Sequence, residues 1–239
     1  MKRTNLNFPG MTRRGLQTER RGEGDTATDV IFGYGSVTFR EGDAGTEFWL
    51  WSDTVEHIMP GAFDRSLRDD DVRSFFNHDA NIILGRRQPG RDVNTLDLSV
   101  DSVGLRYDVT PPAAHAGVIE SVARGDVSGS SFMFDPTETT WRETVVDGQT
   151  VWVREITEVR LFEVGPVVWP AYIGTTADAR SALSSDPLLK RYLGWLERHV
   201  ACARNEFEDF RLNSREARDQ RSTAMESRLA EIETRNLTP

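Results

Sequence analysis

The sequence predicts an α+β fold that is mainly β, with a closed or sandwich-like core and helices packed outside it. From Asp29 to about Tyr172 the chain runs in short strand-like segments bounded by Gly, Pro and Asp. Apolar and polar residues alternate clearly at 95–100, whereas two stretches have helical spacing. Many strands with few helices are typical of this class.

The elements are expected in a regular order. Phe75–Asp79 is expected to be a strand that presents His78, and a turn at Asp101–Leu105 joins two strands into a hairpin. The helices are expected at 61–67 and at 116–124, where apolar residues recur with helical spacing. The remaining strands are expected at 31–39, 95–100, 105–109, 127–134, 139–145, 151–156 and 159–169.

Four regions are expected along the chain. Residues 1–28 are expected to be a basic, disordered leader, because six basic residues stand against Glu19 alone in 1–22. The folded domain is expected at 29–172. Residues 173–187 have the Ala, Thr, Ser, Asp and Gly composition of a linker, and 188–239 are expected to form a helical tail.

The tail carries a short heptad seam. Its apolar residues alternate at spacings of four and three: Leu189, Leu193, Leu196, Val200, Ala203, Phe207 and Phe210. Such a helix can dock on its own β domain, on a partner helix or on a second copy of the chain. The tail is therefore expected to be an interaction or oligomerisation element without chemistry of its own.

Composition excludes several classes of protein. The chain has 239 residues, so it can bury a core, and its one cysteine, Cys202, rules out an intrachain disulfide and a cysteine-rich zinc cluster. The net charge of -9 argues against a nucleic-acid-binding surface over the whole molecule. No stretch has the roughly 18 apolar residues of a membrane span, nor is a signal peptide apparent. We expect an intracellular protein without metal, cofactor, membrane or nucleic-acid partner.

His78 is the histidine with the strongest claim to chemistry. It follows two phenylalanines, stands between Asn77 and Asp79, and precedes an apolar run. For His57, His115 and His199, a surface or structural role is favoured. No histidine or cysteine pair has metal-ligand spacing.

A serine segment is the second candidate. Residues 125–134 bring Ser128, Ser130 and Ser131 into a strand that continues as Phe132-Met133-Phe134. On a strand, Ser131 and Met133 share one face, while the two phenylalanines share the other and point into the core. Ser131 would then face a cleft, and the backbone around Ser130 is a possible source of oxyanion-stabilising N–H groups.

Glu163 is a lone carboxylate within an apolar strand. Burying it unpaired would be costly, so we expect a cationic or hydrogen-bonding partner. A carboxylate that orients a histidine is the usual third member of a serine triad. Glu158 is the alternative third member and is expected to be the more exposed of the two.

In order, these segments resemble the prohead (capsid maturation) serine proteases of tailed bacteriophages, whose fold is shared with the herpesvirus assemblins. The resemblance covers roughly 30–173. It rests on Gly33-Tyr34, Glu56 with Pro60-Gly61-Ala62-Phe63, Asn77-His78-Asp79 with Leu84-Gly85-Arg86, Thr95-Leu96 with Gly104-Leu105, Gly125-Asp126 with Gly129 and Ser131-Phe132-x-Phe134, Leu161-x-Glu163-Val164, and Pro170-Ala171-Tyr172.

The resemblance implies a closed antiparallel β-barrel core with surrounding helices. It also implies His78 as general base, Ser131 as nucleophile and an acidic third member, placed at Glu163. Two departures stand out: Met133 occupies a position where glycine is common, and Gly165-Pro166 replaces the usual serine after Glu-Val. Arg86 is a candidate electrostatic helper, although an exposed arginine is more often simply solvated.

The implied function is a serine endopeptidase that cleaves scaffold and capsid-protein segments, and itself, during prohead maturation. It would act in the host cytoplasm inside the assembling prohead, with the major capsid protein and scaffold as substrates and a homodimer or helix-mediated oligomer as a possible assembly. The alternative is a non-catalytic capsid assembly or scaffolding protein that keeps the protease fold.

Overall fold

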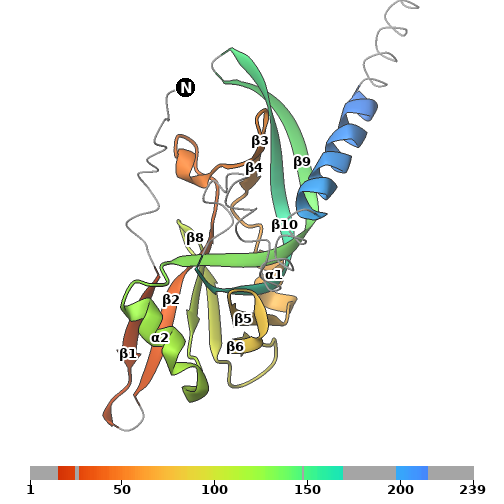
Figure 1. Ribbon diagram of the computed structural model, residues 1–239. Coiled ribbons are helices and arrows are strands. Elements are labelled where there is room, and N and C mark those ends of the chain that lie inside the picture. Colours follow the sequence, from red (N-terminus) through yellow and green to blue (C-terminus); the bar gives the residue numbers. More distant parts are fainter. Residues whose placement is uncertain (1–15, 25–26, 147, 169–197, 215–239) are drawn as a thin grey trace, which may run out of the picture. The chain divides into compact units, whose positions relative to one another are not determined.

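The computed structural model describes residues 16–24, 27–146, 148–168 and 198–214 (Figure 1). The chain divides into two compact units, residues 1–194 and 195–239. The described part of the first unit holds strands β1 to β10 and the helices α1 and α2. In the second unit, residues 198–214 are helical, whereas the expected linker at 173–187 lies outside the described residues.

Sheet A has four antiparallel strands in the order β1-β2-β8-β7. Along β8, from Leu105 to Val109, buried positions alternate with half-buried ones, as expected for a strand with one face in the core. Ile31, Leu105 and Tyr107 are fully buried there. The strands are β1 (Gln17–Arg21), β2 (Thr28–Val37), β7 (Leu96–Val100) and β8 (Gly104–Val109).

Sheet B is organised around the long strand β10 (Gln149–Val167). One edge of β10 pairs in parallel with β4 at residues 152–156 and with β5 at Glu163, while β9 (Gly129–Val146) pairs antiparallel with it from end to end. The outer strands are β3 and β6. The remaining bounds are β3 (Phe48–Trp51), β4 (Thr54–Ile58), β5 (Val72–Phe76) and β6 (Asp79–Arg87).

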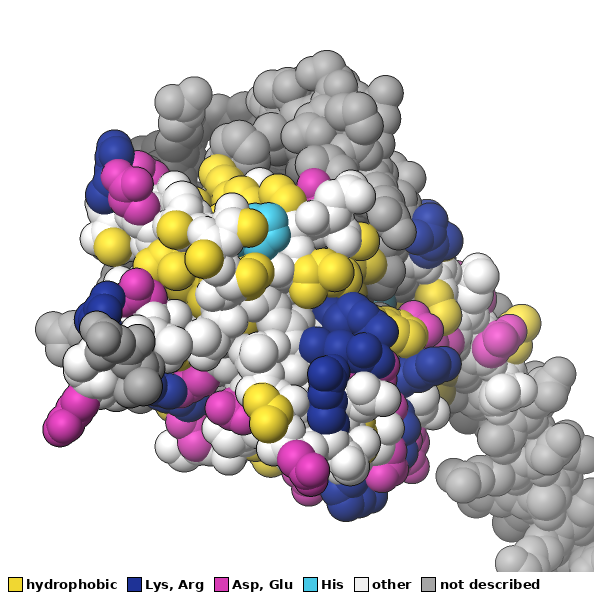
Figure 2. All heavy atoms as spheres, turned by 90° about the horizontal axis from the view of Figure 1, so that it is seen from below, with side chains coloured by type: hydrophobic (Ala, Val, Ile, Leu, Met, Phe, Trp, Pro, Cys, Tyr) yellow, Lys and Arg dark blue, Asp and Glu magenta, His cyan; other side chains and the backbone are white. Residues whose placement is uncertain are grey.

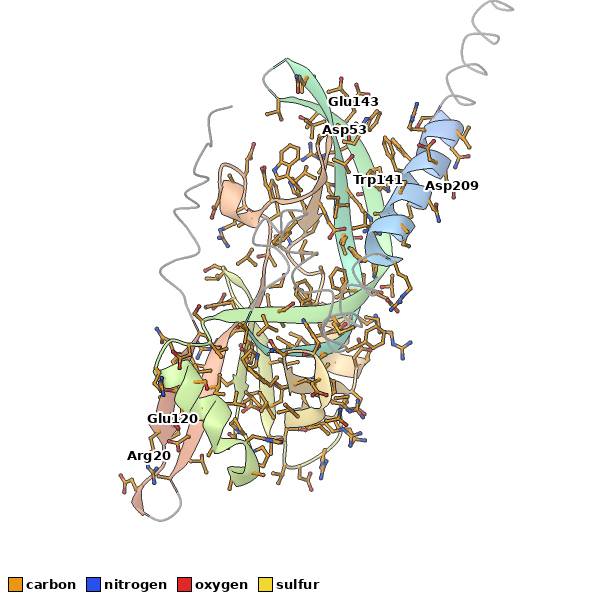
Figure 3. The ribbon with its side chains drawn as sticks, in the orientation of Figure 1. Arg20, Asp53, Glu120, Trp141, Glu143 and Asp209 are labelled. Carbon is orange, nitrogen blue, oxygen red and sulfur yellow. The ribbon has the colours of Figure 1, made fainter. Side chains whose placement is uncertain are left out.

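At the end of sheet B near the β9–β10 turn, Trp152 of β10 joins the strands on either side of it. Trp152 pairs with Thr54 of β4 on one side and with Glu143 of β9 on the other, and its N–H donates to the carbonyl of Asp53 over 2.8 Å. Asp53, Trp141 and Glu143 all lie toward this end of the sheet (Figure 3). The β9–β10 hairpin thus extends well beyond the strands β5 and β6 (Figure 1).

The helices α1 and α2 of the first unit are short and lie against its sheets. In α1 (Asp64–Asp69), the Ser66 hydroxyl donates to the carbonyl of Val159 over 2.6 Å and accepts from the N–H of Leu161 over 3.1 Å. This helix is therefore fastened to the middle of β10. Helix α2 (Ala116–Ala123) packs on β1 and β2. No helix in the described ranges is long and apolar enough to cross a membrane.

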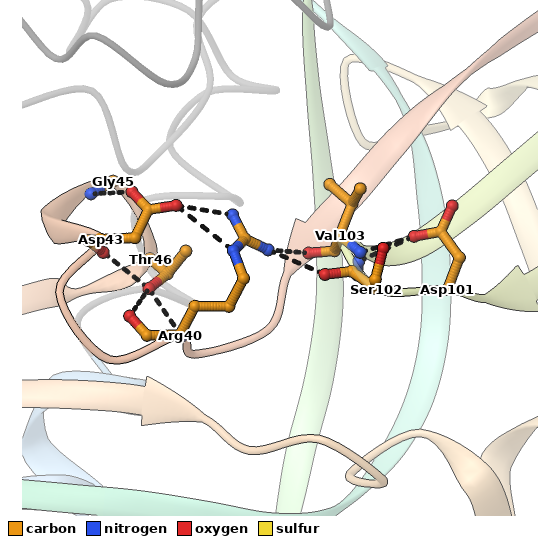
Figure 4. Close-up of polar contacts among 8 residues, drawn as sticks. Arg40, Asp43, Gly45, Thr46, Asp101, Ser102 and Val103 are labelled. Atoms are coloured by element: carbon orange, nitrogen blue, oxygen red, sulfur yellow. Dashed lines mark hydrogen bonds and ion pairs between the residues drawn. The ribbon is translucent and has the colours of Figure 1, made fainter.

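Arg40 links the two sheets beyond the end of β2. Its guanidinium donates to the carbonyls of Ser102 and Val103, in the turn between β7 and β8, over 3.2 and 2.9 Å. The same group binds Asp43 Oδ2 over 2.8 Å, just before the short turn at 44–46 that leads to β3 (Figure 4). Arg40 thus helps to hold the connection from sheet A to sheet B, together with the N–H of Phe39, which donates to the carbonyl of Ile58 over 2.7 Å.

The mainly β fold with few helices is confirmed, but the described strands do not close into the expected barrel. Strand β2 contacts β9, but no ladder joins them: β2 pairs with β1 at residues 28–32 and with β8 at residues 31–37. The two sheets also approach each other between β6 and β7. There the Thr95 N–H donates to the Arg86 carbonyl over 3.2 Å, but β6 and β7 form no ladder. The assemblin-like architecture stays a prediction.

Several elements differ from their predicted bounds. Residues 17–21, within the expected leader, form β1 on the edge of β2, and the expected breaks in 127–146 and 151–169 are absent. Pro136 falls at a register shift, where its missing N–H breaks no regular ladder. The hairpin at Asp101–Leu105 is confirmed, with Asp101 Oδ1 accepting from the N–H of Val103 over 2.7 Å.

The surface seen from below is mixed in character. Apolar side chains gather around a histidine, and a separate group of basic side chains lies beside them (Figure 2). Acidic side chains are interspersed near the edges of this face. Opposite charges close together fit the many ion pairs, such as Arg86 with Asp71, found among the described residues.

His57 of β4 is buried away from the candidate site. Its ring stacks on Phe39, with centroids 3.7 Å apart, and neither ring nitrogen has a hydrogen-bond partner among the described residues. Burial, followed by the positive charge of Arg142, lowers the pKa of His57 to about 4. Folded His57 is therefore neutral at neutral pH.

We expect His57 to lower the free energy of unfolding as the pH falls from 6.5 to about 4. In this window an unfolded histidine binds a proton and folded His57 does not, so acid favours the unfolded chain. The loss is on the order of 2 kcal/mol, measured by urea unfolding at several pH values. His57→Phe keeps a stacking ring without a titrating group, so this part of the pH dependence should vanish; an unchanged dependence would contradict the prediction.

Candidate active site

His78 sits at the tip of the β5–β6 hairpin. Asn77 and His78 form its two-residue loop, and both have positive φ values, 54° and 59°. Positive φ at both loop residues is the signature of a type I′ turn, which Asn adopts readily. For histidine this backbone is less common and costs on the order of 1 kcal/mol. The turn fixes the direction in which the imidazole leaves the backbone.

Asn77 fastens this turn to the end of β10. Its N–H donates to the carbonyl of Pro166 over 3.0 Å, and its Oδ1 accepts from the N–H of Val168 over 2.9 Å. The backbone and side chain of Asn77 thus bind the chain on both sides of Val167, the last residue of β10. The hydrogen bonds of Asn77 therefore fix the position of His78 relative to β10, independently of the contacts of the His78 side chain.

The imidazole of His78 meets the carboxylate of Glu163. The distance from Nδ1 to Oε2 is 2.5 Å, and the two side chains are 7% and 2% exposed. A buried carboxylate needs such a partner, because leaving it alone in an apolar strand would be costly. The second oxygen, Oε1, is buried without a hydrogen-bond partner among the described residues. Glu163 thus orients the ring through Nδ1.

Gly165 allows β5 to approach β10. A Cβ atom at this position would overlap the carbonyl oxygen of Phe75 and would lie 3.1 Å from Oγ of Ser74. Gly165 is buried and Phe75 is half-buried, and the Phe75 carbonyl belongs to the strand that leads directly to His78. The absence of a side chain at Gly165 is therefore what lets His78 reach Glu163.

Ser131 lies on the adjacent strand, β9, opposite Gly165. Met133 lies opposite Glu163, so Ser131 and Glu163 face the same side of the ladder as diagonal neighbours, with backbones roughly 7–8 Å apart. Ser131 is 3% exposed, and its Oγ has no hydrogen-bond partner among the described residues. A buried hydroxyl without a hydrogen bond, on the face of the ladder that carries Glu163, is free to be activated by a base, as nucleophilic catalysis requires.

The phenylalanines beside Ser131 anchor its strand from the other face. Phe132 and Phe134 are buried and stacked, with ring centroids 4.8 Å apart. Phe63 packs edge-on against Phe132 at 6.0 Å. This arrangement follows the predicted alternation along 131–134, and it holds Ser131 on the face that carries Glu163.

A cavity of about 310 Å³ adjoins the His78–Glu163 pair. Both of these side chains form part of its lining, and Met133 contributes the wall on β9. The other lining residues are Arg73, Phe75, Ala80 and Phe162. Among the described residues, no group of three or more His, Cys, Asp or Glu side chains is placed to hold a metal ion.

Three other predicted site residues have partners elsewhere. Glu158, the alternative third member, accepts from Arg65 Nε over 3.0 Å and from Thr137 Oγ1 over 2.7 Å. Ser130 shares a hydrogen bond of 2.9 Å with the hydroxyl of Tyr107, whose pKa is raised by burial.

Arg86, the proposed electrostatic helper, is committed to a surface ion pair. It binds both oxygens of Asp71 over 2.8 and 2.6 Å. The Arg86 hydrogen bond is the main reason that the pKa of Asp71 lies below its usual value. Nothing in the described contacts directs Arg86 toward Ser131.

The positioning roles of Asn77 and Gly165 were not predicted from the sequence. Two neighbouring residues between two strands, one of them Asn, are the signal of a two-residue hairpin loop, which could have identified Asn77. Gly165 could not have been identified in this way, because its role depends on a strand that lies 90 residues earlier in the sequence.

The comparison with family models gives one match. A model described as caudovirus prohead serine protease matches residues 16–187. The matched region includes β1 and every residue of the candidate site. The searches of curated proteins and of solved structures give no match.

We expect Gly165→Ala to lower the free energy of unfolding by about 1–3 kcal/mol, because the new methyl group must push the Phe75 carbonyl away. Urea unfolding measures this loss. The matched control is Gly117→Ala in α2, where an added Cβ meets nothing within 4 Å and stability should be unchanged or higher. Equal stability of the two variants would refute the close approach at Gly165.

Proposed function

Because the chain belongs to the caudovirus prohead serine proteases, we propose that it is a serine endopeptidase that cleaves scaffold and capsid-protein segments, and itself, during prohead maturation. The observation that supports this most directly is the buried contact between His78 Nδ1 and Glu163 Oε2, beside Ser131 on the same face of the sheet. A histidine held by a carboxylate near an uncommitted serine is the arrangement that activates a hydroxyl.

The proposed reaction proceeds in two stages. Nδ1 donates to Glu163, so Nε2 of His78 takes the proton from Ser131 Oγ as the oxygen forms a bond with the scissile carbonyl carbon. The C–N bond then breaks, and the imidazolium gives the proton to the leaving amine. Water attacks the resulting ester in the same way and releases the acid. Glu163 stabilises the imidazolium throughout.

We propose that the enzyme works inside the assembling prohead in the host cytoplasm, as its family implies. The major capsid protein and scaffold would be its substrates. The helix at 198–214 belongs to the expected tail, and we propose that this tail brings the enzyme into the shell by pairing with scaffold or with a second copy. Such recruitment would keep the catalytic domain near its substrates.

Replacing Ser131 should abolish the processing of the capsid protein. We expect Ser131→Ala and His78→Ala each to reduce the cleavage rate by at least about 10⁴-fold, because either change removes the activated nucleophile. The measurement is co-expression of the full chain with the neighbouring major capsid protein, followed by mass spectrometry of all products.

The matched control for this experiment is Ser128→Ala, an exposed serine in the same segment, which should process normally. Identical capsid bands from the wild type, Ser131→Ala and His78→Ala would favour the non-catalytic assembly protein. Cleavage that survives Ser131→Ala but is lost in another serine variant would mean that the nucleophile is misassigned.

The same assay distinguishes the roles of Glu163 and Glu158. We expect Glu163→Gln to lower the cleavage rate by about 10³–10⁴-fold, since an amide neither fixes the tautomer nor stabilises the imidazolium. Glu158→Gln should process normally, because it loses only a partly exposed contact with Arg65. Normal processing by Glu163→Gln would rule out this residue as the third member.

A further inference from the structure

The cavity beside the His78–Glu163 pair has a definite relation to Ser131. Met133 forms its wall on β9, and Met133 follows Ser131 by two residues on the same face of that strand. Two residues of a strand span about 6.6–6.8 Å. The cavity therefore begins roughly one side-chain length from the proposed nucleophile.

A bulge in β10 shapes the same cavity. Between Leu161 and Glu163 the register slips by one residue, so that Phe162 has no cross-strand partner on β9. A bulge of this kind redirects side chains that would otherwise alternate between faces. It explains why Phe162 and its neighbour Glu163 both line the cavity.

The remaining walls are mainly apolar. Phe75, Ala80, Met133 and Phe162 surround the space, and they offer no hydrogen-bonding side chain. Of the charged groups at its edge, Glu163 binds His78 through Oε2, and Arg73 Nη2 binds Asp71 Oδ2 over 3.2 Å. A charged substrate side chain would lose water against the apolar walls, which offer it no hydrogen bond.

We propose that this cavity receives an apolar side chain of the substrate residue next to the scissile bond, and that Met133 sets the size of the side chain it accepts. This inference rests on the proposed serine protease function. A preformed apolar pocket beside the catalytic groups binds a side chain by removing its surface from water. A substitution of Met133 changes the size of the cavity with little effect on the His78–Glu163 pair, because Met133 contributes no polar group.

The test is a cleavage profile of the purified full chain on a peptide library that presents all twenty amino acids. We expect the wild type to prefer Leu, Met or Phe over Ala, and over Asp or Lys, at one position beside the cleaved bond. Met133→Ala should shift the ratio of large to small apolar residues at that position upward by about tenfold, and Met133→Phe should shift it downward by a similar factor.

Two controls separate this inference from the proposed function. Met59→Ala changes a half-buried methionine that does not line the cavity and should leave the profile unchanged. Labelling of Ser131 by a small fluorophosphonate, with and without Ser131→Ala, reports the activated serine independently of peptide binding. Thermal unfolding shows whether each Met133 variant is folded.

Each outcome decides between the two claims. Serine-dependent cleavage whose preference ignores Met133, or favours charged residues, would overturn the pocket and leave the protease standing. Labelling of Ser131 without cleavage of any peptide would also overturn the pocket, because a preformed site should bind short apolar peptides. If neither labelling nor serine-dependent cleavage occurs, the proposed function fails and the pocket with it.

Discussion

The continuous strand β10 is the constraint on which the rest of the first unit, and the candidate site in it, depends. One edge carries β9 along its whole length, while the other carries β4 near its start and β5 near its end. Glu163 stands where β9 and β5 flank the same stretch, between Met133 and Arg73. A side chain at this point is enclosed on both sides. The carboxylate, the histidine hairpin and the serine strand are thus positioned by one element.

The site is built from irregular positions in otherwise regular strands. Asn77 and His78 use left-handed backbone conformations, Phe162 lies at a bulge, and Gly165 has no side chain where two strands come close together. Each of these departs from an ideal sheet and each places a group of the site. Natural proteins tolerate such departures mainly where function requires them. The regular parts, such as the stacked Phe132 and Phe134, supply the rigid frame.

Local pattern was enough to predict much of this arrangement. Alternation along 131–134 placed Ser131 opposite the core phenylalanines, and the isolated carboxylate of Glu163 predicted a polar partner, which the structure supplies as His78. Their catalytic roles stay predictions. Strand order could not be predicted, because pairing between distant segments leaves no local signal; for this reason the two open sheets were missed. Strand β1 was missed because its residues are polar and charged and show no apolar alternation. Met133 stood out as a departure in the sequence, but only the fold places it on the cavity wall.

The parallel pairing of β5 with β10 bears on when activity can appear during synthesis. His78 and Glu163 are 85 residues apart in the chain, and their contact requires β10, the last strand in sequence order among the described residues. Closing so long a loop carries an entropic cost that local hairpins avoid, so contacts of this kind form late in folding. A ribosome-bound fragment that ends before β10 has the histidine hairpin and the serine but no carboxylate to orient the imidazole. Topology alone thus keeps a newly made chain from forming the His78–Glu163 contact before β10 has been synthesised.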